Sequence, residues 1–223
     1  TLRAVLADGH MVERTLTVEA AAGVALASTA LLSPLAQAQA KKPVAGKDYG
    51  VLEQRSPVDA PAGKVEVVEF FSYACPHCNA FEPTFSEWTK RAPKDVVIRR
   101  VPVSFLQNPV VFQRLYFSLE AMNLVDKLHA SVFAAVHDEH RNFNDAAAAA
   151  DWVASKGGDR AKFLENFNSF TVANKATKAS QLTNSYKIEG VPALGVAGRF
   201  LTEGTAKGLQ TVDALIAEVK AGR

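Results

Sequence analysis

The segment from residue 65 to residue 85 constrains the fold more than any other, because a hydrophobic strand, a cysteine pair and a helix follow one another without a gap. Residues 65–71 are rich in β-branched and aromatic side chains and lack clean alternation, which predicts a central strand buried on both faces. The sequence Cys-Pro-His-Cys follows at 75–78, and apolar residues then recur at helical spacing up to Trp88. We therefore expect the cysteines where the helix begins.

The helix start makes Cys75 the reactive cysteine of the pair. Pro76 suits the first turn of a helix, where no backbone N–H partner is lost, so Cys75 takes the N-cap position. Its sulfur then faces free N–H groups and the positive end of the helix dipole, and both favour a thiolate over a thiol. We predict a redox-active pair, with the Cys75 sulfur exposed to substrate and Cys78 buried one turn further along.

Other uses of a cysteine pair fit this sequence less well. A structural disulfide between residues three apart closes too small a loop to restrain the chain much. A zinc site needs four ligands, and the second pair would have to be His137 and His140, about sixty residues away. Haem attachment needs histidine directly after the second cysteine, where this chain has Asn79. We therefore predict no metal site and no cofactor.

Composition and the N-terminus bear on the compartment and the partners. Two cysteines in 223 residues provide no disulfide framework, and a formal net charge of +2 with scattered Lys and Arg makes a nucleic-acid partner unexpected. Residues 1–40 are typical of a secretory signal peptide, because a small-residue apolar run ends in two overlapping Ala-x-Ala sites. Met11 is an alternative start. The alternative of a membrane anchor is disfavoured because the apolar run is short and rich in alanine. Export to an oxidising compartment follows.

The rest of the chain is predicted to form a small sheet interrupted by a block of helices. From residue 109 to residue 186 apolar residues recur at helical spacing with no strand between them, and Asp145 and Asp159 are expected to cap two of the helices. Pro102 marks the end or the edge of a strand. The expected strands are residues 49–54, 65–71, 96–103, 191–197 and 199–201, and the expected closing helix is 211–220.

This order resembles the DsbA family of periplasmic thiol:disulfide oxidoreductases. The resemblance rests on Glu-Phe-Phe-Ser-Tyr at 69–73 leading into Cys-Pro-His-Cys, and on Gly-Val-Pro at 190–192 after a helical insertion. It implies an α/β thioredoxin fold, a mixed central sheet flanked by helices, with an inserted all-helical domain. The implied parts are a signal peptide at 1–40, a thioredoxin-like domain at 41–108 and 187–223, and the helical insertion at 109–186.

The resemblance implies that the Cys75–Cys78 disulfide is donated to exported proteins during oxidative folding. His77 then stabilises the Cys75 thiolate, unless it is an ordinary surface histidine. The proline after Val191 has a cis peptide bond in the family and packs beside the sulfurs; the alternative is a trans proline that opens a strand. Substrate would bind by strand addition. The implied substrate-binding residues are Pro76, His77, Val191 and Pro192.

Glu69 stands six residues before Cys75 in an apolar strand, where a buried carboxylate is unusual unless it has a partner or a function. By resemblance it handles the proton of Cys78, and the alternative is a structural ion pair with Arg100, where the family often has lysine. The other histidines are predicted to be surface or structural residues; they are His129, His137 and His140.

The partners follow from the same resemblance. They are cysteine-containing exported proteins as substrates and a DsbB-like membrane quinone reductase as the reoxidant, with the enzyme acting as a monomer in the periplasm. Two alternatives remain. One is a thioredoxin-fold reductase or isomerase, although residues 41–63 are too short for the N-terminal dimerisation domain that isomerases usually carry. The other is a non-enzymatic folding factor whose helical insertion holds unfolded clients.

Overall fold

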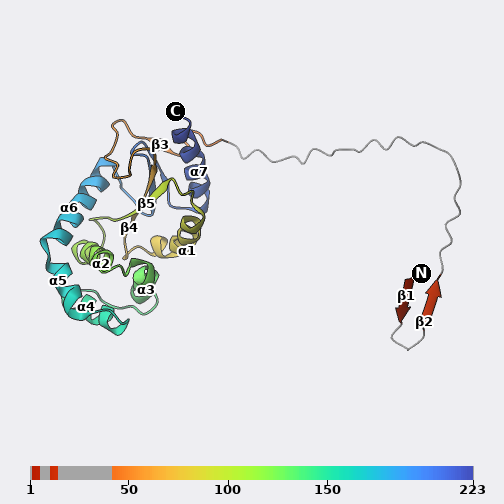
Figure 1. Ribbon diagram of the computed structural model, residues 1–223. Coiled ribbons are helices and arrows are strands. Elements are labelled where there is room, and N and C mark those ends of the chain that lie inside the picture. The colour runs from red at the N-terminus through yellow and green to blue at the C-terminus, as the bar shows by residue number, and fades with distance from the viewer. Residues whose placement is uncertain (1, 6–10, 15–41, 223) are drawn as a thin grey trace. The chain divides into compact units, whose positions relative to one another are not determined.

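The computed structural model describes residues 2–5, 11–14 and 42–222, which belong to two separate units. The first unit contains two paired antiparallel strands, β1 (Leu2–Val5) and β2 (Met11–Arg14), and the second unit contains every other element (Figure 1). Most of the predicted signal peptide at 1–40, including both predicted cleavage sites, lies outside the described residues. No helix within the described residues is long and apolar enough to span a membrane.

A mixed sheet of five strands in the order β3-β7-β6-β4-β5 forms the centre of the second unit. β4 runs parallel to β5 and antiparallel to β6. All seven residues of β4 are buried, as predicted for a central strand, and β5 lies at an edge, where Pro102 is tolerated. The strands are β3 (Gly50–Val51), β4 (Val65–Phe71), β5 (Val96–Pro102), β6 (Ala193–Val196) and β7 (Phe200–Glu203).

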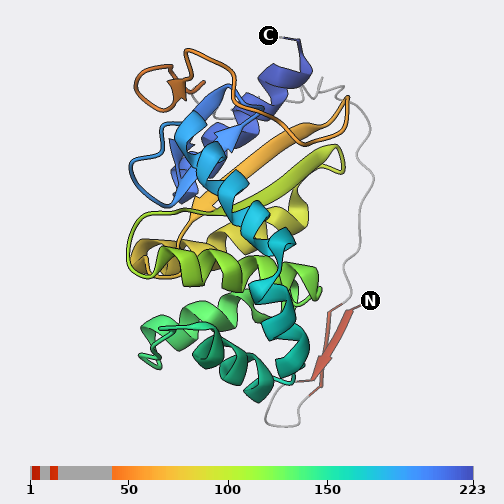
Figure 2. The ribbon, with the colours of Figure 1, turned by 90° about the vertical axis from the view of Figure 1, so that its left-hand side faces the viewer.

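Helices cover both faces of this sheet. On one face α1 (Pro76–Arg91) and α7 (Ala206–Lys220) pack against β4 residues such as Val67, whereas the neighbouring Val68 belongs to the core on the opposite face. Figure 2 shows α6 (Phe170–Ser185) crossing that opposite face. Val65 and Val67 thus belong to one hydrophobic core, whereas Val68, Phe70 and Phe71 belong to the other. Because both faces of β4 are covered, the strand shows no polar alternation.

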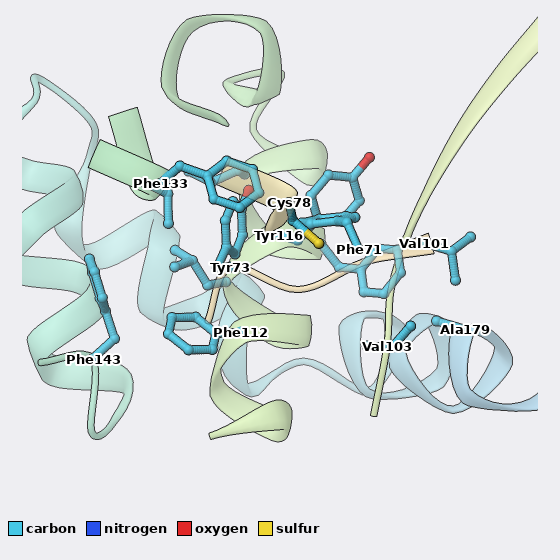
Figure 3. Packing of buried hydrophobic residues seen from close by; sticks show 14 of the residues in the cluster. Phe71, Tyr73, Cys78, Val101, Val103, Phe112, Tyr116, Phe133, Phe143 and Ala179 are labelled. Atoms are coloured by element: carbon cyan, nitrogen blue, oxygen red, sulfur yellow. The ribbon is translucent and has the colours of Figure 1, made fainter. Parts of the chain in front are cut away.

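The helical block follows β5 and returns to the sheet through α6. No strand interrupts residues 109–185, all of which are described, and Asp145 and Asp159 cap two helices as predicted, accepting hydrogen bonds from Ala148 N at 2.8 Å and Lys162 N at 3.0 Å. One apolar cluster runs from the sheet into this block (Figure 3). The helices before α6 are α2 (Pro109–Ala121), α3 (Val125–His137), α4 (Ala146–Ser155) and α5 (Arg160–Asn168).

Several element boundaries differ from the predicted ones, among them those of β3, β6 and α7. The edge strand β3 has two residues rather than six, and β6 begins at Ala193 because the two residues before it belong to a loop. Helix α7 begins at Ala206 rather than at 211, since the Thr205 hydroxyl accepts a hydrogen bond from Gly208 N at 2.9 Å and caps it. The first turn of α7 contains Lys207 and Gly208, which do not continue the apolar periodicity of the helix. The hydrophobic pattern therefore does not predict that the helix begins at Ala206.

The close packing of β6 against Tyr186 provides a test of this core. A Cβ atom at Gly195 would lie 2.4 Å from Tyr186 Cε1, and the Tyr186 side chain is fully buried. We expect Gly195→Ala to lower the free energy of unfolding by about 1–3 kcal/mol, the usual cost of overpacking a core. The matched control is Gly50→Ala in β3, whose added Cβ would meet only Leu201 O at 3.8 Å. Urea melts showing equal stability for the two variants would contradict this packing.

Candidate active site at the start of helix α1

The cysteine motif occupies the position that its residue types predict. Cys75 is the N-cap of α1 with an extended backbone, φ −91° and ψ 116°, and Pro76 is the first helical residue. The Cys75 sulfur accepts a hydrogen bond from Cys78 N at 3.4 Å. A sulfur held in this way faces the free N–H groups of the first turn, which is the arrangement that stabilises a thiolate.

The prediction that the Cys75 sulfur is exposed is wrong. Cys75 is only 6% exposed and Cys78 is fully buried, and both are free thiols. The loop before β6 covers the reactive sulfur, because Cys75 Sγ lies 3.4 Å from the Val191 carbonyl oxygen, to which it donates. Figure 3 shows Cys78 among the buried aromatic side chains of the large apolar cluster.

Burial has a direct effect on the second cysteine. It raises the pKa of the Cys78 thiol well above its ordinary value, and the Cys75 sulfur and the negative charge of Glu69 raise it further. A backbone N–H at Ser72 opposes these effects without reversing them. Cys78 is therefore a thiol at neutral pH, and any reaction that needs its thiolate needs a nearby base.

The Val191–Pro192 peptide bond is cis, as the resemblance implied. The bond lies in the loop between α6 and β6, and the Pro192 carbonyl accepts a hydrogen bond from Gly204 N at 2.9 Å. A Cβ at Gly204 would come within 2.4 Å of Pro192 Cβ, so only glycine permits this approach of β7 to the loop. The carbonyl of Val191 is thereby placed over Cys75.

A hollow of about 440 Å³ opens beside this loop. It brings together three of the predicted substrate-binding residues, namely His77, Val191 and Pro192, with Phe81 from the next turn of α1. The fourth predicted residue, Pro76, is exposed at the helix start but does not line the hollow. A second hollow of about 620 Å³ shares Val191 and Pro192, so the loop forms part of the wall of both.

Glu69 lies on β4 beneath α1 and is 1% exposed. The predicted ion pair is present: Arg100, its register partner on β5, donates from Nε to Glu69 Oε2 at 3.0 Å. Arg100 Nη2 also donates to Glu82 Oε1 at 2.8 Å, so one guanidinium holds two buried acids. Glu82 was not among the predicted site residues, although it stands four residues after Cys78 and so shares its buried face of α1.

The pKa values of the two acids are shifted in opposite directions. Burial raises the pKa of Glu69 to about 8, with Arg100 opposing this and the charge of Glu82 adding to it. Burial also favours protonated Glu82, but His129 and Arg100 outweigh it and hold the pKa of Glu82 below its ordinary value. Pairs of titratable groups whose environments separate their pKa values are typical of proton-transfer sites. Near neutral pH the arrangement keeps a proton on Glu69 and a charge on Glu82.

The three histidines predicted to be surface or structural residues differ in burial: His129 is buried, His137 is half-buried and His140 is exposed. His129 on α3 is 4% exposed, and its Nδ1 lies 2.7 Å from the Tyr73 hydroxyl. Its Nε2 is 3.3 Å from Glu82 Oε2, in contact although not aligned as a hydrogen bond. His137 Nε2 lies 2.9 Å from the Tyr73 carbonyl oxygen, and His140 is exposed. We call Glu69, Arg100, Glu82 and His129 the buried charged cluster.

Three members of this cluster have metal-ligating side chains. Ligand atoms of Glu69, Glu82 and His129 lie within 4.8 Å of one another. The guanidinium of Arg100 already binds both carboxylates, however, so a positive charge occupies the place that a cation would take. Both carboxylates of the cluster thus already have a cationic partner in Arg100.

Comparisons with known proteins agree with this geometry. The thiol:disulfide interchange protein DsbA of Bordetella parapertussis is 42% identical over 203 residues, covering 88% of this chain and 94% of the relative. The protein of that name from Pseudomonas aeruginosa is 40% identical over 189 residues, covering 82% and 89%. The crystal structure of Pseudomonas aeruginosa DsbA matches with a TM-score of 0.77 at 37% identity, covering 81% of this chain and 96% of that chain.

A more distant structure, the oxidoreductase NmDsbA1 from N. meningitidis, matches with a TM-score of 0.72 at 29% identity, covering 80% of this chain and 95% of that one. The structural matches confirm the predicted α/β thioredoxin fold. Residues 66–220 match the DSBA-like thioredoxin domain, a span that includes the cysteine motif, the helical block and the cis-proline loop. This chain therefore belongs to the DSBA-like thioredoxin family.

Proposed function

We propose that this protein is a disulfide oxidase that transfers the Cys75–Cys78 disulfide to cysteine-containing exported proteins in the periplasm. Its family and the relatives named thiol:disulfide interchange protein support the enzyme class. The observation that carries the proposal is the Cys75 sulfur at the start of α1, in contact with the Val191 carbonyl. A folding factor that only binds its clients would not need a cysteine at the helix N-cap, Cys75, next to a second, buried cysteine, Cys78.

The reaction begins from the oxidised enzyme. A substrate thiolate attacks Sγ of Cys75, the bond between the two enzyme sulfurs breaks, and Cys78 leaves with the electron pair and takes up a proton. A second substrate thiolate then attacks the substrate sulfur of the mixed disulfide and releases Cys75 as a thiolate. Two substrate thiols lose two electrons and two protons in total, and the enzyme disulfide becomes a dithiol.

Each predicted site residue has a role in this sequence. The helix start stabilises Cys75 as a leaving thiolate, and His77 adds a polar or positive group at the same end of α1. Val191 and Pro192 present backbone to an extended substrate segment, as an added strand requires. Glu69, protonated at neutral pH by its burial, supplies the proton that Cys78 needs when it leaves, and takes it back when the enzyme is reoxidised.

Reoxidation completes the cycle. A DsbB-like membrane quinone reductase would accept the Cys75 thiolate at its own disulfide, after which Cys78 attacks Cys75 and restores the enzyme disulfide. The hollow beside His77 and Pro192 is the place where the partner's cysteine segment would lie, since it adjoins the reactive end of α1.

Oxidation of a peptide with two cysteines tests the proposal. The oxidised protein should convert the peptide to its disulfide form with loss of one enzyme disulfide per peptide. Cys78→Ser cannot form the enzyme disulfide and should not oxidise the peptide, but after reaction with oxidised glutathione it should retain a mixed disulfide on Cys75, because the resolving sulfur is gone. Cys75→Ser should be inactive. A reductase would favour the opposite direction against glutathione, and a binding protein would show no dependence on Cys75.

The buried carboxyl group gives a prediction about pH. A pKa of about 8 for folded Glu69, above its ordinary value of 4.5, means that the protonated form fits the fold. Its contribution to stability is complete below pH 4.5 and is lost as the pH rises through 8. In the oxidised protein, where neither thiol titrates, the free energy of unfolding should fall by a few kcal/mol more between pH 5 and pH 9 than in Glu69→Gln, at about 1.4 kcal/mol for each pKa unit.

The matched control is the exposed Glu165→Gln on α5, which should keep the pH dependence of the unchanged protein. Denaturant melts at both pH values measure the difference. If Glu69→Gln lost as much stability between pH 5 and pH 9 as the unchanged protein, Glu69 would not be the group that titrates, and its proposed proton role would fail.

A further inference from the structure

His129 contacts the active-site segment on both sides of the cysteine motif. Tyr73, its partner through Nδ1, lies two residues before Cys75, and Glu82, near its Nε2, lies one turn after Cys78. The histidine itself comes from α3 in the helical block, 56 residues after Tyr73. One buried side chain of the helical block thus contacts both the segment before the cysteine motif and helix α1 after it.

The surroundings of His129 determine which ring nitrogen carries the proton. A carboxylate oxygen faces Nε2, so Nε2 carries the hydrogen, and the Nδ1 lone pair then accepts from the Tyr73 hydroxyl. Burial lowers the pKa of His129, in agreement with this neutral form. Both oxygens of Glu82 therefore have a neighbour: Oε1 accepts from Arg100 Nη2, and Oε2 lies 3.3 Å from His129 Nε2.

The position of Arg100 depends on this arrangement. Its guanidinium donates from Nε to Glu69 and from Nη2 to Glu82, so it is shared between two acids. When one acid of such a pair loses charge, the guanidinium acts more strongly on the other. Anything that anchors the charged form of Glu82 therefore keeps Arg100 shared and keeps a second negative charge near Glu69.

Other groups around His129 cannot replace that anchor. The charged or titratable groups that face it are Tyr73 before α1, Glu69 on β4, Glu82 on α1, Arg100 on β5 and Tyr116 on α2, whose ring centroid is 5.9 Å away. Phe71 and Phe133 pack against the ring from β4 and α3. Of the two facing carboxylates, Glu82 is the one in contact with the ring, at 3.3 Å from Nε2, and Arg100 is the one permanent cation among these groups.

We propose that His129 is a positioning residue for proton transfer at Cys78: by anchoring Glu82 it keeps Arg100 shared between two acids and so sets the pH at which Glu69 exchanges its proton. The proposal rests on the proton role of Glu69 proposed above and extends it to the helical block. Removing the anchor should raise the proton affinity of Glu82. Arg100 then acts mainly on Glu69, which should lose its proton at a lower pH.

The resolution of a mixed disulfide with glutathione measures this effect. Glutathione is placed on Cys75, and the rate at which Cys78 expels it as a thiolate is followed by acid quenching from pH 5 to pH 9. The proton of Cys78 goes to Glu69, so the rate should rise as Glu69 becomes ionised. His129→Asn keeps a polar group near Tyr73 but does not reach Glu82, and it should move the midpoint to lower pH by about half a unit, which makes resolution about threefold faster below the midpoint.

Matched variants separate positioning from a merely structural role. His129→Gln places an amide N–H where Nε2 stood, so it should restore the midpoint of the unchanged protein. Tyr73→Phe removes the other hydrogen bond and leaves the contact of His129 with Glu82, so the midpoint should not move. Denaturant melts accompany each variant, and if His129→Asn folds too poorly to assay, Glu82→Gln should give the same shift to lower pH.

The outcomes distinguish the positioning role of His129 from the proton role of Glu69 on which it rests. If Glu69→Gln kept the pH profile of the unchanged protein, the proton role of Glu69 would be refuted. If the profile depended on Glu69 but His129→Asn lowered only stability and left the midpoint in place, the positioning role alone would be refuted. A shift by His129→Asn that persisted in the Glu69→Gln background would also overturn it, since His129 would then act by another route.

Discussion

The Cys75 sulfur at the N-cap of α1 is the contact on which the rest of the site depends. It requires a helix that begins immediately after a buried strand, and Pro76 permits that start without the loss of a hydrogen bond. β4 supplies the rigid base, because both of its faces are covered. The loop that carries Val191, which follows the helical block in the sequence, then covers the sulfur. The helix start and the Val191 carbonyl thus both act on the Cys75 sulfur.

Beneath this contact the fold keeps two acids and one guanidinium in a region with little water. A guanidinium that is shared between two carboxylates cannot neutralise both, and the pKa values of the two acids differ accordingly: that of Glu69 is raised and that of Glu82 is lowered. Burial also raises the pKa of the Cys78 thiol above them. The proton role that we propose for Glu69 would link these two effects of burial.

Local patterns in the sequence predicted the features that depend on neighbouring residues: the buried strand β4, the start of α1 and the two aspartate caps. Features that join distant segments were predicted only in part: the Glu69–Arg100 ion pair was an alternative based on a carboxylate in an apolar strand, and the cis bond before Pro192 came from a resemblance. The burial of Cys75 depends on a loop 116 residues away, and the place of His129 depends on how α3 packs against α1. Hydrophobic periodicity carries no information on either packing.

The most direct test of the account compares the stability of the oxidised and reduced protein. Cross-linking a four-residue loop should stabilise the oxidised form by about 2 kcal/mol through the unfolded chain. Only in the folded reduced form does a free Cys75 sulfur face the N–H groups of the helix start, an arrangement that favours a thiolate. We predict that the reduced protein unfolds at a higher denaturant concentration than the oxidised protein at pH 7. A reduced form no more stable than the oxidised form at pH 7 would contradict the account.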